Sequence, residues 1–340
     1  MSDAAGIAVL GACAGWCLIT ATARAGRPEG VLLAVLAVAA GYACGRIGGA
    51  LVPVAASCVV GAGGLWLVVV LPHAVPTPDT VAPLGRAGAT AALLALSAGA
   101  VCCAAWSAGR RAVRIALHVA AGGTVVVAAA VGSEAGTAAC VGVVLCSLAA
   151  GRMRRRALGL AALGLVTAVV AALAVGLARN VLPTGLTAAL EGQLTPHRVL
   201  LWRDALHLAE TDPALGSGPG RFQQLSPTLA GSPLPDGKPH SAVLQAAAEQ
   251  GVIGVALLAA AYCWLLYALW RSARSTQVVL AAGAALTSVA AMAAAGNALS
   301  FTTVTAGVGL LAGIATAEPL PDDPSHDEAA APAGVRDGRD

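Results

Sequence analysis

Long apolar runs separated by short polar or charged connections dominate the chain. A membrane-spanning α-helix needs roughly 20 apolar residues to cross about 30 Å of hydrocarbon. We count ten runs of about this length, each bounded by charge, proline or a polar turn: Ala5–Ala23, Val31–Gly45, Ala50–Leu71, Ala89–Trp106, Ile115–Gly132, Ala135–Ala150, Ala157–Ala178, Ala248–Trp270, Val278–Ala295 and Leu299–Ala317. The pattern predicts an all-α, polytopic integral membrane helical bundle of about ten transmembrane helices. One large extracytoplasmic loop carries a short amphipathic helix.

The composition agrees with a protein built for a bilayer. Charged residues make up 11% of the 340 residues and hydrophobic types 58%, whereas soluble domains are about 25% charged. No basic segment precedes the first apolar run, and further spans follow it, so we interpret it as a retained helix and not a signal peptide.

The arginines predict the orientation, because positively charged connections stay in the cytoplasm. Arginines fall in alternate connections, at Arg46, Arg110, Arg111, Arg114, Arg152, Arg154, Arg155, Arg156, Arg271 and Arg274. We therefore expect a multi-pass plasma-membrane protein with both termini cytoplasmic and the loop 179–247 extracytoplasmic.

Four regions follow from this division. They are an N-terminal transmembrane bundle of seven helices (1–178), the extracytoplasmic loop (179–247), a C-terminal transmembrane bundle of three helices (248–317) and a cytoplasmic tail (318–340). The tail is rich in proline, alanine and aspartate, which predicts disorder.

Small residues inside the spans predict close helix packing. Glycines at 41, 45, 48 and 49 allow neighbouring helices to approach closely in lipid. All nine cysteines lie within predicted spans and none has a metal-ligand spacing, so we interpret them as packing residues and expect no disulfide framework.

The sequence of the large loop contains start and stop signals for one helix. Thr195-Pro196 is a helix start, and Thr211-Asp212-Pro213 stops a helix expected over about His197–Glu210. Arg198 and Trp202 share one face of it. Apolar positions form a stripe at helical spacing, and charged positions lie together on the helix, which predicts an amphipathic helix that rests on the membrane surface.

A glycine-rich segment follows this helix. Gly216-x-Gly218-x-Gly220 predicts a tight turn and not a nucleotide site, because no βαβ unit flanks it. Four prolines predict that Phe222–Pro239 is irregular, after which the chain re-enters the bilayer at His240.

Four cations of the loop are candidate ligands for a lipid-linked diphosphate: Arg198, Arg203, Arg221 and Lys238. Guanidinium groups bind phosphate oxygens in a fork geometry. Such a site needs no metal, and we expect no cofactor. The alternative for each cation is an ordinary loop charge that interacts with anionic lipid heads.

The strongest candidate for proton transfer is His240. An imidazole can accept a proton from a sugar hydroxyl near neutral pH, and Ser241 can cap the following helix. Glu249 lies nine residues on, where a carboxylate near the bilayer is costly enough to suggest a role. The alternative is that Glu249 pairs with a loop arginine for structural reasons.

Taken together, the loop resembles the O-antigen ligase/polymerase superfamily. The resemblance covers about sixty residues and rests on Arg198-x3-Trp202, Asp204-Ala205, Pro213, Gly216-x-Gly218-x-Gly220-x-Phe222, His240, Leu244, Glu249-x-Gly251 and Gly254. It implies a metal-independent membrane glycosyltransferase of cell-surface polysaccharide assembly. Such an enzyme moves a glycan from a polyprenyl diphosphate carrier to a glycan, lipid or protein acceptor. We expect membrane lipids as its surroundings and no nucleic-acid partner.

The resemblance also implies residue roles. Arg198 would grip the diphosphate, and His240 would help to activate the acceptor hydroxyl. Apart from the resemblance, we count Glu249 as a third catalytic candidate, because its carboxylate could orient His240 through a tertiary contact. Their charges and position in the loop, and not the resemblance, make Arg203, Arg221 and Lys238 candidates for binding the carrier, together with Trp202 beside Arg198.

The chain departs from the family pattern at three points. Ser241 stands where asparagine is usual, Ser133-Glu134 stands where serine-arginine is common, and ten spans stand where about twelve are usual. These departures keep open a second class of function, a non-catalytic scaffold or transport component of envelope glycan assembly. The sequence does not separate a ligase from a polymerase.

Overall fold

The computed structural model describes residues 2–74, 83–153, 155–183, 185, 196–230 and 237–318. Within these ranges the regular structure is helical, with no strand, which confirms the predicted all-α class. The helices are α1 (Ser2–Arg24), α2 (Glu29–Leu51), α3 (Pro53–Ala74), α4 (Pro83–Ser107), α5 (Arg111–Ala130), α6 (Glu134–Ala150), α7 (Arg156–Ala178), α9 (Pro196–Thr211), α10 (Phe222–Leu225), α11 (Pro227–Ala230), α12 (Ala242–Arg271), α13 (Thr276–Ala295), the 3₁₀ turn η1 (Ala298–Ser300) and α14 (Thr302–Thr316). The helix cap expected from Thr195 and nearly all of the predicted tail lie outside the described residues.

Each of the ten predicted spans corresponds to a helix. Eight are long and apolar enough to cross a membrane, whereas α6 and α14 are shorter, with 17 and 15 residues. The predicted end of the second span at Gly45 was wrong, because α2 continues to Leu51. Pro53, which cannot continue a helix, then opens α3.

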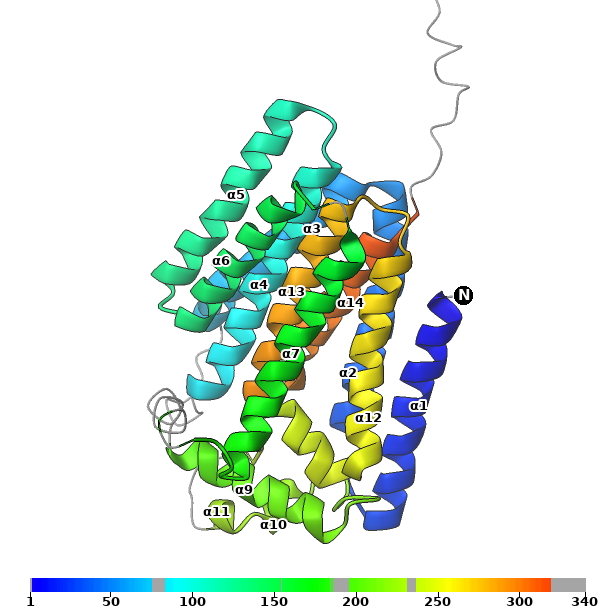
Figure 1. Cartoon of the computed structure of the whole chain (residues 1–340), viewed down its shortest axis with the longest axis vertical. Coiled ribbons are helices and arrows are strands. Elements are labelled where there is room, and N and C mark those ends of the chain that lie inside the picture. The colour runs from blue at the N-terminus through cyan, green and yellow to red at the C-terminus, as the bar shows by residue number, and fades with distance from the viewer. Residues whose placement is uncertain are drawn as a thin grey trace, which may run out of the picture.

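The N-terminal and C-terminal helices share one core. In Figure 1, α4 and α13 run through the middle of the bundle. In their apolar stretches, 78% of the residues of α4 and 72% of those of α13 are buried. The helices α2 and α14 meet backbone to backbone. A Cβ on Gly45 would clash with the Leu310 carbonyl, and one on Gly313 with the Tyr42 carbonyl, so the expected close approach at the glycines is confirmed.

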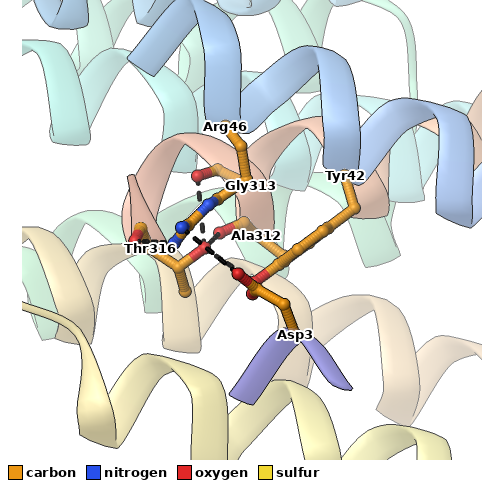
Figure 2. A network of polar contacts seen from close by, with 6 residues as sticks. All are labelled: Asp3, Tyr42, Arg46, Ala312, Gly313 and Thr316. Atoms are coloured by element: carbon orange, nitrogen blue, oxygen red, sulfur yellow. Dashed lines mark hydrogen bonds and ion pairs between the residues drawn. The ribbon is translucent and has the colours of Figure 1, made fainter. Parts of the chain in front are cut away.

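A polar network ties the start of α1 to α2 and the end of α14 (Figure 2). The Tyr42 hydroxyl donates to Asp3 Oδ1 at 3.0 Å, and Thr316 Oγ1 donates to the Tyr42 oxygen at 3.2 Å. Arg46 pairs with Asp3 and donates to the Thr316 carbonyl, one of the carbonyls that a helix end leaves unpaired. Both described ends of the chain therefore lie at one end of the bundle, and the loop with α9, α10 and α11 lies at the other (Figure 1).

Candidate active site at a broken helix

The helix that follows the loop is broken at Gly251. Its φ of 67° and ψ of −164° are not helical, and they divide α12 into segments 242–250 and 252–271. The predicted start of this span at Ala248 was therefore wrong, because the chain is already helical from Ala242. Ser241 caps the first segment as expected, since its hydroxyl oxygen accepts from the Leu244 amide at 3.3 Å.

The glycine-rich turn caps the C-terminal end of the first segment. A helix end leaves carbonyls without intrahelical partners, and this is costly away from water. Ser217 donates from its amide and its hydroxyl to the Ala248 carbonyl, at 2.8 and 2.9 Å. The Gly218 amide donates to the Glu249 carbonyl at 2.9 Å. The turn thus replaces the hydrogen bonds that the break removes.

Two further contacts complete this accounting. The Trp16 ring nitrogen on α1 donates to the Gln250 carbonyl at 3.0 Å. On the other side of the break, the Val252 amide donates to the Pro213 carbonyl at 2.8 Å. Groups on both sides of the break are therefore paired, and one partner comes from the far end of the sequence.

The glycines are needed because this fit is close. Gly216, Gly218 and Gly220 all have positive φ, at 67°, 97° and 71°, so the predicted tight turn is confirmed. A Cβ on Gly216 would lie 2.6 Å from the Gln250 nitrogen, and a Cβ on Gly251 would lie 2.5 Å from the Pro213 oxygen. The spacing of these glycines serves a backbone-to-backbone contact.

The loop helix α9 lies close to its predicted position, His197–Glu210, but not in the expected setting. Its apolar residues, including Trp202 with 1% exposure, belong to a small core with Leu177 of α7 and Leu244 of α12. The prediction that this face rests on lipid was wrong, because the end of the bundle covers it.

The segment after the turn is more regular than predicted. α10 and α11 are one-turn helices within Phe222–Pro239, and Pro227 begins α11, a position that suits proline. Asp204 of α9 accepts hydrogen bonds from the Ser226 hydroxyl and, at 3.0 Å, from the Thr228 amide. The carboxylate thus fixes α11 to α9.

Arg198 is the loop cation with the most distinctive environment. It is half-buried, and burial lowers the pKa of its guanidinium. In the part of the chain that the structure describes, ion pairs join Arg24 to Asp212 and Arg46 to Asp3, and Arg198 takes part in neither. Its charge is partly desolvated and has no carboxylate partner there.

The other loop cations differ from Arg198 and from one another. Arg203 is exposed on α9. Arg221 donates to the Arg24 carbonyl at 2.9 Å, so it holds the turn to α1. Lys238 is half-buried and acts electrostatically on the carboxylate of Glu249.

Glu249 is 4% exposed and directed at the loop. Its carboxylate accepts from Gln245 Nε2 at 3.4 Å and from backbone amides of Gly220 and Phe222. A loop cation does face it, as the structural alternative required, but the cation is Lys238 and not an arginine. His240 is half-buried, with a positive φ of 53°, directly before the cap of α12.

Sequence reasoning missed the contribution of α1. Besides Trp16, the Arg27 amide donates to the Pro219 carbonyl at 2.7 Å, and Arg24 pairs with Asp212. Nothing local in the sequence marks these residues, because their partners lie about 190 to 230 residues away.

The departure at Ser133-Glu134 has a local structural role. The Ser133 hydroxyl oxygen accepts from the Gly136 amide at 3.1 Å and caps α6, and Glu134 is exposed in its first turn. An acidic residue at this position suits the positive end of the helix dipole.

Fold and site together define a polytopic helical membrane protein with a polar loop built on a broken helix. No three His, Cys, Asp or Glu side chains gather around a possible metal position in the residues described above. Residues 119–259 of the chain, which include the loop and the break, match the family model described as O-Antigen ligase.

The match covers less than half of the chain, and it confirms the resemblance to the O-antigen ligase/polymerase superfamily that was drawn from the loop residues. At the level of the family, the match supports a ligase-like or polymerase-like role in glycan assembly. No curated protein and no solved structure gives a significant match. Trp16, Arg24 and Arg27 lie outside the matched segment.

Proposed function

We propose that this protein transfers a glycan from a polyprenyl diphosphate carrier to an acceptor hydroxyl, at the extracytoplasmic face of the plasma membrane. The environment of Arg198 supports this most directly. A partly desolvated guanidinium without a carboxylate partner favours an anion as its ligand. It lies on a helix packed against the broken segment of α12.

In the proposed reaction the acceptor oxygen attacks the anomeric carbon of the carrier-linked sugar. The bond from that carbon to the diphosphate oxygen breaks, and the diphosphate leaves with the bonding electrons. His240 accepts the proton of the acceptor hydroxyl, and Arg198 stabilises the charge that develops on the diphosphate. We propose the same electrostatic role for Lys238, and looser contacts with the carrier for Arg203 and Arg221. A metal has no step in this scheme.

We assign Glu249 and Trp202 to the support of this chemistry. Glu249 holds the amides of Gly220 and Phe222 and balances the charge of Lys238. Trp202 fills the core beneath α9 and so fixes the position of Arg198 one turn away. Both residues act by positioning other residues.

Binding of undecaprenyl diphosphate to the purified full-length protein tests the role of Arg198. Arg198→Gln is expected to weaken binding by about tenfold or more, because charge-assisted hydrogen bonds contribute about 1.5–3 kcal/mol. Arg179→Gln, an exposed arginine that follows α7, is the matched control and should bind as the wild type does. Equal binding by Arg198→Gln and the wild type contradicts the proposal.

Transfer is tested separately with His240→Ala. In a strain that lacks the gene and has lost a surface polymer, the wild-type gene restores it and His240→Ala does not, at equal protein abundance. The purified variant still binds undecaprenyl diphosphate, while its transfer rate falls by about 10²–10⁴.

The second candidate function is a non-catalytic scaffold of envelope glycan assembly. It is favoured by Glu134, which stands where an arginine is common in the family and is exposed here. The same complementation separates the two functions, because a scaffold restores the polymer equally well with alanine at position 240.

A further inference from the structure

At the end of the bundle opposite the loop, arginines gather without acidic partners. Arg110, Arg111 and Arg152 are exposed and Arg114 is half-buried. The sequence has no Asp or Glu between Asp79 and Glu134, or between Glu134 and Glu191. Glu134 itself begins α6 at the opposite end of that helix. None of these four arginines forms an ion pair among the described residues.

The arginines also occupy an unfavourable position. Arg110 is the N-cap of α5 but provides no side-chain hydrogen bond, and the first turn contains no acidic residue. Free amides and the positive end of the helix dipole therefore coincide with arginine charge. An anion at this position would be attracted by both.

Trp106 of α4 is surrounded by side chains of α5 and α6. The Arg114 guanidinium carbon lies 6.0 Å from the centroid of the Trp106 ring, and His118 meets that ring edge-on at 5.1 Å. Trp106 Nε1 donates to the Ser147 hydroxyl of α6 at 2.9 Å, and the ring lies beside Gly151.

The Arg114 guanidinium still has a free terminal nitrogen. Nη2 donates to the Ala108 carbonyl at 3.3 Å, whereas Nη1 makes no hydrogen bond among the described residues. Charge-assisted hydrogen bonds are strong, so this free donor of a half-buried guanidinium suits an anionic ligand oxygen.

Apolar side chains adjoin the charges. Val113, Ile115 and Val119 of α5 are 40%, 55% and 70% exposed, and Met153, next to Arg152, is 42% exposed. Exposed apolar side chains beside arginines and an aromatic ring match the two parts of a phospholipid, its chains and its headgroup.

We propose that the start of α5, with Trp106, Arg114 and Arg152, is a binding site for the phosphate headgroup of an anionic membrane lipid. The site is separate from the loop and independent of the proposed transfer reaction. It neutralises the arginines at the start of α5 and fastens this helix, which packs on α4 and α6, to the bundle (Figure 1).

The test measures retention of phosphatidylglycerol by the full-length protein in mixed micelles, by native mass spectrometry, with phosphatidylcholine as the neutral comparison. The wild type is expected to prefer phosphatidylglycerol. Arg114→Gln is expected to lower that affinity by about fivefold, the effect of one arginine near an anionic lipid surface. The matched control is Arg271→Gln, an exposed arginine at the end of α12 that lies outside the cluster, and it should leave the affinity nearly unchanged.

Three results overturn the proposal. Equal losses in Arg114→Gln and Arg271→Gln would mean that the attraction is diffuse. Stabilisation by millimolar inorganic phosphate equal to that by phosphatidylglycerol would mean a site for a free anion. If Arg114→Gln fails to fold, Arg114→Lys takes its place, because lysine keeps the charge but lacks the guanidinium fork. An affinity of Arg114→Lys for phosphatidylglycerol equal to that of the wild type then counts against the site.

Discussion

Replacing Gly251 by alanine tests the central structural claim, that the loop and α12 are built around a break which only glycine permits. The backbone at this position has a positive φ of 67°. A Cβ there would lie 2.5 Å from the Pro213 and Ala214 carbonyl oxygens. Both contacts are to backbone, which cannot rotate away as a side chain would.

The expected loss of stability has two parts. A non-glycine residue in a sparsely populated backbone region costs about 1–3 kcal/mol. If the turn withdraws from the methyl group, the Val252 amide loses its hydrogen bond to the Pro213 carbonyl, which costs roughly a further 0.5–1.5 kcal/mol. The sum, about 1.5–4.5 kcal/mol, is large against a typical unfolding free energy of about 5–15 kcal/mol.

The assay is thermal unfolding of the purified protein in detergent, with limited proteolysis of the loop as a local readout. Gly251→Ala is expected to lower the unfolding temperature by several degrees or more and to speed cleavage of the loop. Gly122→Ala on α5, where a Cβ meets nothing within 4 Å, should be neutral or slightly stabilising. If Gly251→Ala unfolds at the wild-type temperature and its loop stays protected, the break does not depend on glycine and the reasoning fails.

Three further changes probe contacts that join distant parts of the chain. Trp16→Phe keeps an aromatic ring but removes the donor to the Gln250 carbonyl, so the unfolding free energy should fall by about 1–3 kcal/mol, measured by thermal unfolding. Gly45→Ala forces α2 away from α14 and should cost about 1–3 kcal/mol, measured in the same way. Asp204→Asn weakens the anchor of α11, by about 1–2 kcal/mol, and should accelerate proteolysis between α10 and α12.

For each of these changes, one outcome would contradict the contact on which the prediction rests. Trp66 is 59% exposed on α3, so a loss in Trp66→Phe equal to that in Trp16→Phe would show that ring loss alone is responsible. Gly45→Ala should be far worse than Gly122→Ala, and equal effects would deny the backbone contact. A proteolysis rate in Asp204→Asn equal to that of the wild type would mean that α11 is held by other contacts.

The loop motif takes on a physical meaning in the folded chain. Pro213 and the three glycines of the turn lie some 30 residues before Glu249 and Gly251 in the sequence, and the two groups meet at the break. The pattern that carries the family resemblance is therefore largely a pattern of backbone capping. We expect the proposed chemistry of Arg198 and His240 to depend on it, because both lie on elements that the break positions.

The class of the protein and the approximate positions of ten apolar helices follow from local sequence alone. This was possible because a bilayer imposes a local rule: each crossing segment must be apolar and must satisfy its own backbone hydrogen bonds. Local sequence also determined the loop helix, since proline, threonine and aspartate mark its ends locally. The family resemblance was visible because its residues lie within one stretch of the chain, between Arg198 and Gly254.

The roles of these elements follow from contacts between distant segments. Hydrophobicity cannot locate a break in a helix when the capping partners lie in a turn some 30 residues earlier and in α1, more than 230 residues away. For the same reason, the apolar face of α9 was predicted to meet lipid but meets α7 and α12, because an amphipathic pattern records that a face is buried and not what buries it. The break at Gly251, the burial of Trp202 and the role of Trp16 all depend on contacts between segments that local sequence does not relate.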